Sequence, residues 1–409
     1  MSDKNVTNPY YTYGILHLSE NFHRFEASKG STYRAYRHEW VRRPKELDAG
    51  AFPININFEV TTRCNLECTF CTQPTLTEDQ IGDLKWEHFQ KVIDEAETHK
   101  TPAANFNGLG EPALVKKLPD MIRYAKDHGF IDLMFHTNAT VMTESFAQRL
   151  LDCGVDRVIF SVDSPDKKTY EAMRIKSNFD KVVKNVRFFA AKRAEAKRDT
   201  PIIRSTMVVT DETQHQVDDF VKLWKGTVDQ ITVQDLVWRT KNLEGGDWAN
   251  GKENAIPVDL DEVREAALKN GLTFSCPYVY QSAYVFWNGD IIPCSNPNAR
   301  KEMIMGNLDQ KSLGEIWKDK PYQELREMHT TGRWHEHPTC RSCDIPLIEM
   351  YKKLRNEPNA FGSLGAAGST DGNTVAIAQA ARAKGENTED LATRFAKSEA
   401  PVGSAPDAD

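Results

Sequence analysis

Apolar residues recur through the middle of the chain in two alternating patterns. Short apolar runs typical of strands occur at residues 54–60, 103–107, 133–136, 158–162, 202–209 and 230–236. Between them lie longer stretches with helical spacing, at residues 86–98, 118–128, 145–151, 179–193 and 217–224. Six strands that alternate with helices predict a parallel sheet with helices outside it, either barrel-like or doubly wound. In both arrangements ligands bind at the C-terminal ends of the strands.

The residues before this series are aromatic and basic. Tyr33, Tyr36 and Trp40 are spaced to lie on one face of a helix. We therefore expect a leader helix that packs on the main domain. A flap that contacts substrate is the alternative interpretation.

The residues after the series change character twice. Residues 242–253 are rich in Gly, Asp and Asn, which indicates a linker. Further on, Asn288-Gly289 between two alternating apolar runs predicts a β-hairpin, and residues 313–317 predict a helix. From about Asn356 the chain is rich in Gly, Ala and Ser, and its low hydrophobicity predicts disorder.

Composition and charge restrict the class of protein. A net charge of −7 over 409 residues argues against a partner bound through nucleic-acid phosphates. No apolar run approaches the roughly 20 residues that span a bilayer, and the first residues show no secretory signal pattern. We therefore expect a cytoplasmic protein with no membrane partner, in which cysteines remain thiols.

Three of the eight cysteines, Cys64, Cys68 and Cys71, lie directly after the first strand. A disulfide uses two cysteines, a structural zinc site uses four, and a 4Fe–4S cluster is usually held by four. A cluster held by only three would leave one iron open to a small ligand. Cys153, at the end of a helix, is expected to be a buried structural residue.

The loops after the next three strands carry polar residues that would lie beside these cysteines. Gly110-Glu111 follows the second strand, Thr137-Asn138 the third, and the segment from Ser161 to Asp163 the fourth. Glycine allows close approach of the backbone, and a glutamate carboxylate can accept hydrogen bonds from an ammonium group. Arg204, Gln234 and Asp235, on the last two strands, are candidate catalytic residues because a strand directs alternate side chains inward.

A second group of cysteines comprises Cys276, Cys294, Cys340 and Cys343. The predicted hairpin would bring the first two towards the last two. Four thiolates suit a structural zinc ion or a cluster, and the spacing alone does not decide between them.

The CxxxCxxC segment, the Gly-Glu-Pro segment and the Thr-Asn and Ser-x-Asp loops together resemble the radical S-adenosylmethionine (SAM) superfamily. The resemblance implies a partial (β/α)6 TIM-like barrel. It also implies that Cys64, Cys68 and Cys71 hold a 4Fe–4S cluster whose open iron binds SAM. The family pattern Gly-Gly-Glu-Pro reads Leu109-Gly110-Glu111-Pro112 here, so we expect a slightly different backbone approach.

The same resemblance implies roles for the residues around the cofactor. Phe70 would lie near the adenine, and Gly110 and Glu111 would bind the amino group of SAM. The other implied SAM contacts are Thr137, Asn138, Ser161 and Asp163.

The C-terminal cysteines, with Asn288-Gly289-Asp290 and Gly306-Asn307, resemble a twitch or shortened SPASM domain. In that family the four cysteines hold one auxiliary 4Fe–4S cluster. The implied segments are an N-terminal extension at 1–50, a radical SAM core at 51–240, an auxiliary-cluster domain at 241–355 and a tail at 356–409.

The implied activity begins with an electron from flavodoxin or ferredoxin and produces a 5′-deoxyadenosyl radical that takes hydrogen from a substrate. The shortened domain is most similar to the aminocyclitol dehydrogenase branch. We therefore expect oxidation or epimerisation of a small polar metabolite, such as a sugar or aminocyclitol. One alternative is a peptide or protein modifier of the sulfatase-maturation or ribosomal-peptide type. Another, of a different class, is a non-catalytic iron–sulfur or zinc protein.

Overall fold

The computed structural model describes residues 14–210, 212–235, 265–266, 269–271, 274–343 and 345–346. Within these residues, one ten-stranded sheet has the order β1-β9-β8-β6-β5-β4-β2-β10-β11-β12. Its strands are β1 (Gly14–Leu18), β2 (Asn55–Phe58), β4 (Ala103–Phe106), β5 (Asp132–Thr137), β6 (Arg157–Ser161), β8 (Ile202–Val209), β9 (Gln230–Asp235), β10 (Ser282–Val285), β11 (Asp290–Ile292) and β12 (Gly306–Asn307).

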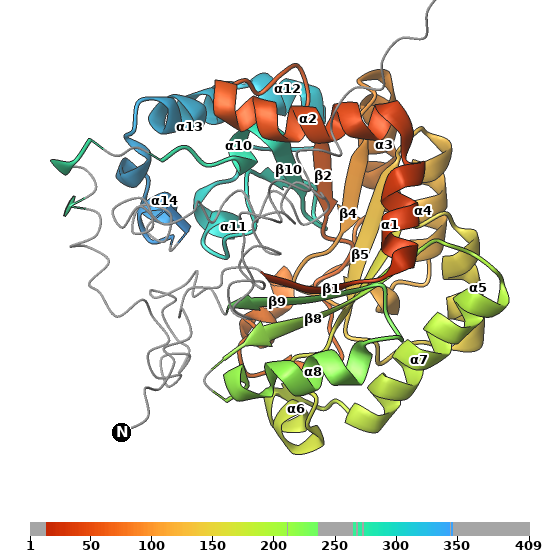
Figure 1. Ribbon diagram of the computed structural model, residues 1–409. Coiled ribbons are helices and arrows are strands. Elements are labelled where there is room, and N and C mark those ends of the chain that lie inside the picture. Colours follow the sequence, from red (N-terminus) through yellow and green to blue (C-terminus); the bar gives the residue numbers. More distant parts are fainter. Residues whose placement is uncertain are drawn as a thin grey trace, which may run out of the picture.

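Six neighbouring strands form the parallel part of the sheet that the sequence predicts. Strands β2, β4, β5, β6, β8 and β9 pair in that order, each parallel to the next. The helices that connect them lie outside the curved sheet (Figure 1). They are α3 (Trp86–Thr98), α4 (Leu118–Asp127), α5 (Glu144–Asp152), α6 (Lys167–Met173), α7 (Phe179–Glu195) and α8 (Val217–Trp224). The α/β fold and its partial barrel are therefore confirmed.

Both edges of this barrel are extended by strands from outside the βα series. Strand β1 pairs antiparallel with β9, and β10 pairs parallel with β2. The expected hairpin is present, because β10 and β11 are antiparallel and Gly289 between them has φ +89°. The sequence did not predict that the hairpin would continue the barrel sheet. An open sheet edge leaves N–H and C=O groups unpaired, and both added strands satisfy such groups.

The N-terminal segment packs on the barrel through two helices, α1 (Glu20–Ser28) and α2 (Gly30–Glu46). Tyr33 and Tyr36 of α2 are buried against Ile54 and Ala103, and Trp40 packs beside them. The expected leader helix is thus confirmed.

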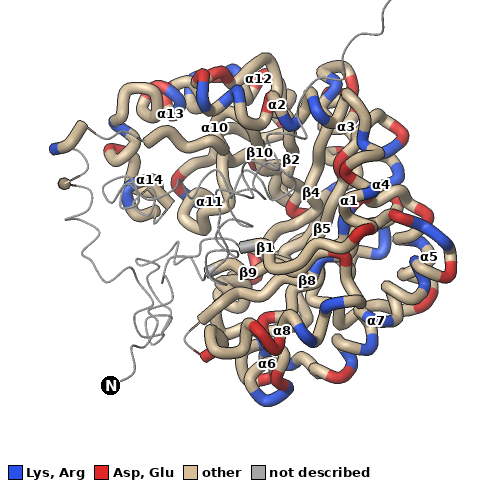
Figure 2. The backbone as a smooth tube through the Cα atoms, in the orientation of Figure 1, with Lys and Arg blue, Asp and Glu red and all other residues tan. Residues whose placement is uncertain are grey.

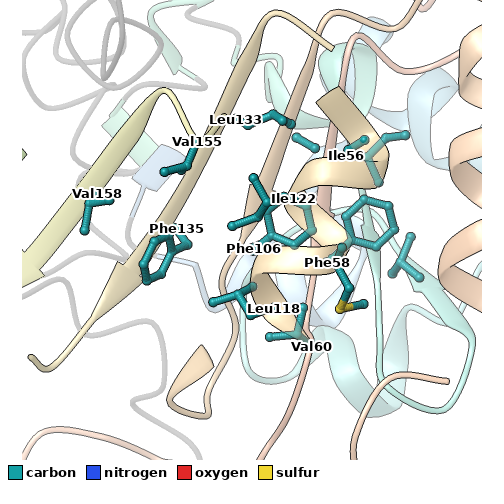
Figure 3. Packing of buried hydrophobic residues seen from close by; sticks show 14 of the residues in the cluster. Ile56, Phe58, Val60, Phe106, Leu118, Ile122, Leu133, Phe135, Val155 and Val158 are labelled. Carbon is teal, nitrogen blue, oxygen red and sulfur yellow. The ribbon is translucent and has the colours of Figure 1, made fainter. Parts of the chain in front are cut away.

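The hydrophobic core fills the space between the barrel strands and the outer helices. Leu118 and Ile122 of α4 face Phe58, Phe106 and Leu133 of three adjacent strands (Figure 3). Side chains alternate along each strand, so the residues next to these core positions face the barrel lumen. Asn57 of β2, Asn105 of β4 and His136 of β5 occupy such positions and give this part of the lumen polar chemistry.

The C-terminal helices are short and lie beside β10–β12 (Figure 1). They are α10 (Tyr278–Gln281), α11 (Ala299–Glu302), α12 (Leu313–Lys318), α13 (Lys320–Thr330) and α14 (Pro338–Arg341). Helix α12 was predicted, and it begins at a capping box made by Ser312 and Glu315. The predicted linker at 242–253 and the tail from 356 lie outside the described residues.

Charged residues lie mainly on the outer surface. Lys and Arg are interspersed with Asp and Glu over helices α4, α5 and α7 (Figure 2). Of the helices that the structure describes, none has both the length and the hydropathy needed to cross a membrane.

Candidate active site and auxiliary cysteine site

The first three cysteines occupy the loop that follows β2, where all three are partly buried. The short strand β3 (Glu67–Cys68) pairs antiparallel with β7 (Arg174–Ile175), so the middle cysteine is held by backbone pairing. Burial is the main cause that raises the pKa of Cys68 to about 12, and the charges of Cys71 and Cys64 add to it. The three thiols therefore lie close enough to repel one another when ionised. Binding to a metal cluster would relieve that repulsion.

Arg174 supplies a positive charge at this loop. Its Nη1 lies 4.0 Å from the Cys68 Sγ, and its guanidinium carbon lies 5.7 Å from the centroid of the Phe70 ring. Arg174 was not among the predicted site residues. The available signal was its place in a short strand that pairs with the cysteine loop, and neither two-residue strand is detectable from periodicity.

Asp163 holds this arginine in place. Its Oδ2 accepts hydrogen bonds from Arg174 Nε at 2.7 Å and lies 2.6 Å from Nη2, while its Oδ1 accepts from the Val208 N–H at 2.9 Å. The structure therefore uses this buried carboxylate to position Arg174 between two strands. Ser161, at the end of β6, is partly exposed beside it.

Glu111 joins three loops at the strand ends. One carboxylate oxygen accepts from the Thr137 hydroxyl at 2.6 Å and the Ala113 N–H at 3.0 Å, and the other accepts from the Asn138 N–H at 2.6 Å. Burial raises the pKa of Glu111, and these donors act in the opposite direction. A carboxylate has about four acceptor positions, so one is left for an ammonium donor. The predicted contact with the amino group of SAM remains a prediction.

The Asn138 side chain extends this network to the cysteine loop, because its Nδ2 donates to the Asn65 Oδ1 at 3.0 Å. Gly110 is in contact with the same loop. A Cβ added at Gly110 would lie 2.4 Å from the Thr61 carbonyl oxygen and 2.6 Å from that of Arg63. The glycine is therefore required by backbone packed against the cysteine loop.

The four C-terminal cysteines line one small cavity of about 40 Å³. Burial raises the pKa of the Cys276 thiol well above its usual value, with Cys294 and Cys343 adding to the effect through their charges. The hairpin and α14 thus bring these residues together as the sequence predicts. Cys153 is elsewhere, 3 % exposed, with its Sγ donating to the Leu150 carbonyl oxygen at 3.2 Å, which fits a structural role.

His329 of α13 also lines this cavity, and no motif in the sequence indicated it. Its Nδ1 accepts the Cys276 N–H at 3.2 Å, and its Nε2 lies 3.7 Å from the Cys340 Sγ. Burial, with a smaller effect from the charge of His337, lowers the pKa of His329 to about 4. The imidazole is therefore neutral at physiological pH.

The cysteine geometry differs from that of a preformed zinc site. Four thiolates around one zinc ion, each about 2.3 Å from it, would lie within about 4 Å of one another. Among the residues that the structure describes, no three His, Cys, Asp or Glu side chains converge in this way.

A polar cavity of about 150 Å³ separates the two cysteine sites. Asn57 of β2 and Asn105 of β4 line it, and the Asn105 amide donates to the Asn57 oxygen at 3.3 Å. Asn296 lines both this cavity and the C-terminal cysteine cavity. Within the described residues, Asn57 Nδ2, Asn105 Oδ1 and Asn296 Nδ2 are buried without a hydrogen-bond partner.

An ion pair between buried Glu59 and partly buried Arg300 lines the same cavity. The Glu59 side chain is 2 % exposed and accepts hydrogen bonds from both terminal nitrogens of Arg300 on α11. The distance from Arg300 Nη1 to Glu59 Oε2 is 3.0 Å. Arg300 packs on Phe286 with its guanidinium carbon 4.2 Å from the ring centroid, and its charge also acts to lower the pKa of Cys71. One residue of the C-terminal segment thus connects the cavity with the first cysteine loop.

The candidate catalytic residues on the last strands lie across the barrel lumen. Arg204 of β8 is 4 % exposed, and its charge contributes, after burial, to lowering the pKa of His136 to about 3. Gln234 shares the lumen face of β9 with Thr232, while the side chain of Asp235 lies outside the described part of the structure. His136 is a further lumen residue that the sequence analysis did not select.

Two separate cysteine sites with a polar cavity between them, at the C-terminal ends of a partial βα barrel, fit an iron–sulfur enzyme with an auxiliary centre. The model of the radical SAM superfamily matches residues 58–223 of the chain, and the model of the SPASM iron–sulfur cluster-binding domain matches residues 276–344. The chain therefore carries a radical SAM domain, which implies a 4Fe–4S cluster and SAM, and a SPASM domain, which implies an auxiliary iron–sulfur cluster.

Two curated relatives cover most of their own length. The tungsten-containing aldehyde ferredoxin oxidoreductase cofactor-modifying protein of Pyrococcus furiosus is 28 % identical over 319 residues, which is 70 % of this chain and 86 % of that protein. The AdoMet-dependent heme synthase of Oleidesulfovibrio alaskensis is 27 % identical over 342 residues, 73 % of this chain and 85 % of that protein.

Solved structures support the same fold. Streptococcus suis SuiB, bound to the precursor peptide SuiA, has a TM-score of 0.53 at 18 % identity and covers 79 % of this chain and 77 % of its own. The anSMEcpe structure with AdoMet has a TM-score of 0.52 at 16 % identity, and the match covers 74 % of this chain and 96 % of that one. At these identities the likeness concerns the fold alone.

Proposed function

We propose that Cys64, Cys68 and Cys71 hold the SAM-binding cluster. We further propose that Cys276, Cys294, Cys340 and Cys343 hold the auxiliary cluster. The mutual proximity of the thiols in each set supports both assignments. Glu111, Thr137, Asn138, Ser161 and Phe70 are the proposed SAM contacts, with Gly110 providing the close backbone approach.

We propose that the enzyme oxidises or epimerises a small polar metabolite of sugar or cyclitol type. The observation that carries this proposal is the polar cavity between the two cysteine sites. Its volume of about 150 Å³ is that of a cavity which accommodates a single six-membered ring. A substrate held there would lie between the residues proposed for the first cluster and those proposed for the second.

The cavity lining favours a ligand with several hydroxyl groups. Asn57 and Asn296 each present an amide N–H without a partner among the described residues, and Asn105 presents an amide oxygen. A hydroxyl group both donates and accepts, so a polyol can satisfy donors and acceptors together. Leaving these groups unpaired costs free energy, which a ligand with matching groups would recover.

When bound, SAM and the two clusters supply a hydrogen-abstracting 5′-deoxyadenosyl radical and an acceptor for one further electron. The chain's own residues bind and orient the ring through the asparagine amides. The Glu59–Arg300 ion pair and Phe286 form a fixed wall that limits water around the reacting carbon. Flavodoxin or ferredoxin, in a reducing cytoplasm, is the proposed source of the first electron.

Deuterium transfer tests this proposal. The reconstituted, reduced enzyme is incubated with SAM and perdeuterated inositols, aminocyclitols and hexoses, and 5′-deoxyadenosine is analysed by mass spectrometry. Deuterium in 5′-deoxyadenosine from a ring polyol is the expected result. Transfer from a deuterated peptide alone would refute the small-metabolite assignment.

A matched pair of variants connects that result with the cavity. Asn105→Leu should abolish transfer from the polyol while SAM is still cleaved without substrate turnover. Asn270→Leu, a surface change at an exposed asparagine, should leave transfer unchanged. Equal transfer in both variants would separate the activity from the cavity.

Modification of a larger molecule is the second candidate function. The two relatives are named for cofactor modification and heme synthesis, and these names support a larger substrate. Under this alternative only part of the substrate would enter the cavity. Label transfer would then require the larger substrate, and free sugars and cyclitols would be inert.

A further inference from the structure

His329 occupies a position in the auxiliary cysteine cavity that the proposed function does not explain. It is 3 % exposed and packs edge-on against Phe274, with ring centroids 6.3 Å apart. Both ring nitrogens are directed at cysteines of the proposed cluster site. A side chain held on two sides by ligand residues has a defined orientation relative to whatever those residues bind.

The hydrogen bond at Nδ1 determines where the imidazole proton lies. The Cys276 N–H donates to Nδ1, at 3.2 Å, so Nδ1 must offer its lone pair and carries no hydrogen. A neutral imidazole then has its single hydrogen on Nε2. The backbone of one cysteine therefore selects the tautomer that makes Nε2 a donor.

That Nε2–H group lies next to a second cysteine. The distance from Nε2 to the Cys340 Sγ is 3.7 Å, within hydrogen-bonding range for sulfur. A thiolate bound to a cluster carries negative charge and accepts such a bond. We propose that His329 donates a hydrogen bond from Nε2 to the cluster thiolate of Cys340 and thereby raises the reduction potential of the auxiliary cluster.

Direct ligation of a metal by His329 is a different possibility that the same geometry disfavours. Nε2 could bind iron only through its lone pair, which in a neutral ring requires the hydrogen to be on Nδ1. A hydrogen there would point at the Cys276 N–H, placing two donors against each other. His329 is therefore a positioning and tuning residue rather than a ligand.

The physical basis of the potential shift is electrostatic. Reduction adds an electron to the cluster, so a donor directed at a coordinating sulfur stabilises the reduced form more than the oxidised form. Hydrogen bonds to cluster sulfurs and solvent exposure are among the factors that set these potentials. Because the cavity is small and His329 is buried, water has little room to replace a missing N–H group.

The test is an EPR-monitored redox titration of the reconstituted holoenzyme without substrate. The SAM-binding cluster is identified by the change in its signal when SAM is added. His329→Leu, which lacks the donor, should lower the reduction potential of the auxiliary cluster by about 59 mV. At a fixed solution potential, the ratio of reduced to oxidised auxiliary cluster then falls about tenfold, because one electron is transferred. His329→Gln, whose amide can donate from a similar position, should restore most of the shift.

Two controls make the outcome decisive. His335→Leu changes a nearby histidine for which the structure describes no cysteine contact, and it should leave both potentials unchanged. Iron content should be the same in all variants. An unchanged auxiliary potential in His329→Leu would overturn the proposal, as would loss of half of the iron, which would identify His329 as a ligand. Because no substrate is present, failure of the substrate assignment would not affect the result.

Discussion

The ion pair between Glu59 and Arg300 makes a prediction whose size can be worked out from the structure. Arg300→Leu removes the guanidinium and leaves the Glu59 carboxylate 2 % exposed, with the Leu109 N–H at 3.2 Å as its remaining described donor. Removing one partner of a buried ion pair costs about 3–5 kcal/mol, because the other charge stays buried without compensation.

Differential scanning calorimetry of the cluster-loaded protein under anaerobic conditions measures the effect. At about 2 °C per kcal/mol for a chain of this size, the loss of about 3–5 kcal/mol in Arg300→Leu should lower the Tm by about 6–10 °C. The control is Arg149→Leu, which breaks an exposed ion pair with Asp120 and should cost no more than about 1 kcal/mol.

A second variant tests the cause. Glu59→Gln combined with Arg300→Leu should recover most of the lost Tm, because no charge then remains buried at this site. The reasoning would be refuted if Arg300→Leu left the Tm unchanged, or if the double variant were no more stable than the single one.

The remaining predictions concern the cysteine loop and its supports. Cys68→Ala should abolish reductive cleavage of SAM, measured as 5′-deoxyadenosine, and residual cleavage would show that this thiolate is not a ligand. Gly110→Ala should reduce iron in the first site because its Cβ would meet two carbonyl oxygens. Gly30→Ala strains the backbone at φ +68° before α2, but its Cβ meets nothing within 4 Å, and it should leave iron content unchanged. Thr137→Val should raise the Kd for SAM by about tenfold, since loss of one hydrogen bond to the Glu111 carboxylate costs about 1.5 kcal/mol, and an unchanged Kd would contradict the loop network. Cys153→Ala should retain full iron content and SAM cleavage, and a loss of either would contradict its structural assignment.

Local periodicity was sufficient to predict the βα elements. The predicted helix at 86–98 and the predicted strand at 202–209 have the same first and last residues in the structure. In each, the apolar residues recur with a single period along the whole element. Strand β1 and the β3–β7 pair were not predicted. Each is five residues or shorter, and its partner is more than 100 residues away in the sequence.

The candidate site was predictable where chemistry is concentrated in short motifs. The two cysteine sets and the Gly-Glu-Pro segment could be read from spacing and residue type. Arg174, Arg300 and His329 could not, because arginine and histidine are common on surfaces and their sequence neighbourhoods are unremarkable in pattern. Their importance comes from burial against cysteines or a carboxylate supplied by other elements.

The amino-acid sequence by itself determined that the protein is an α/β protein with one set of three cysteines and another of four. Only the tertiary structure decided that β10 lies beside β2, which places a polar cavity between those sets. The physical reason is that the chemistry of a motif depends on residues that are close together in the sequence. The environment of a cavity, by contrast, depends on which distant strands share hydrogen bonds. The pairing of Ser282 with Asn55 and of Tyr284 with Asn57 brings the auxiliary cysteines to the barrel.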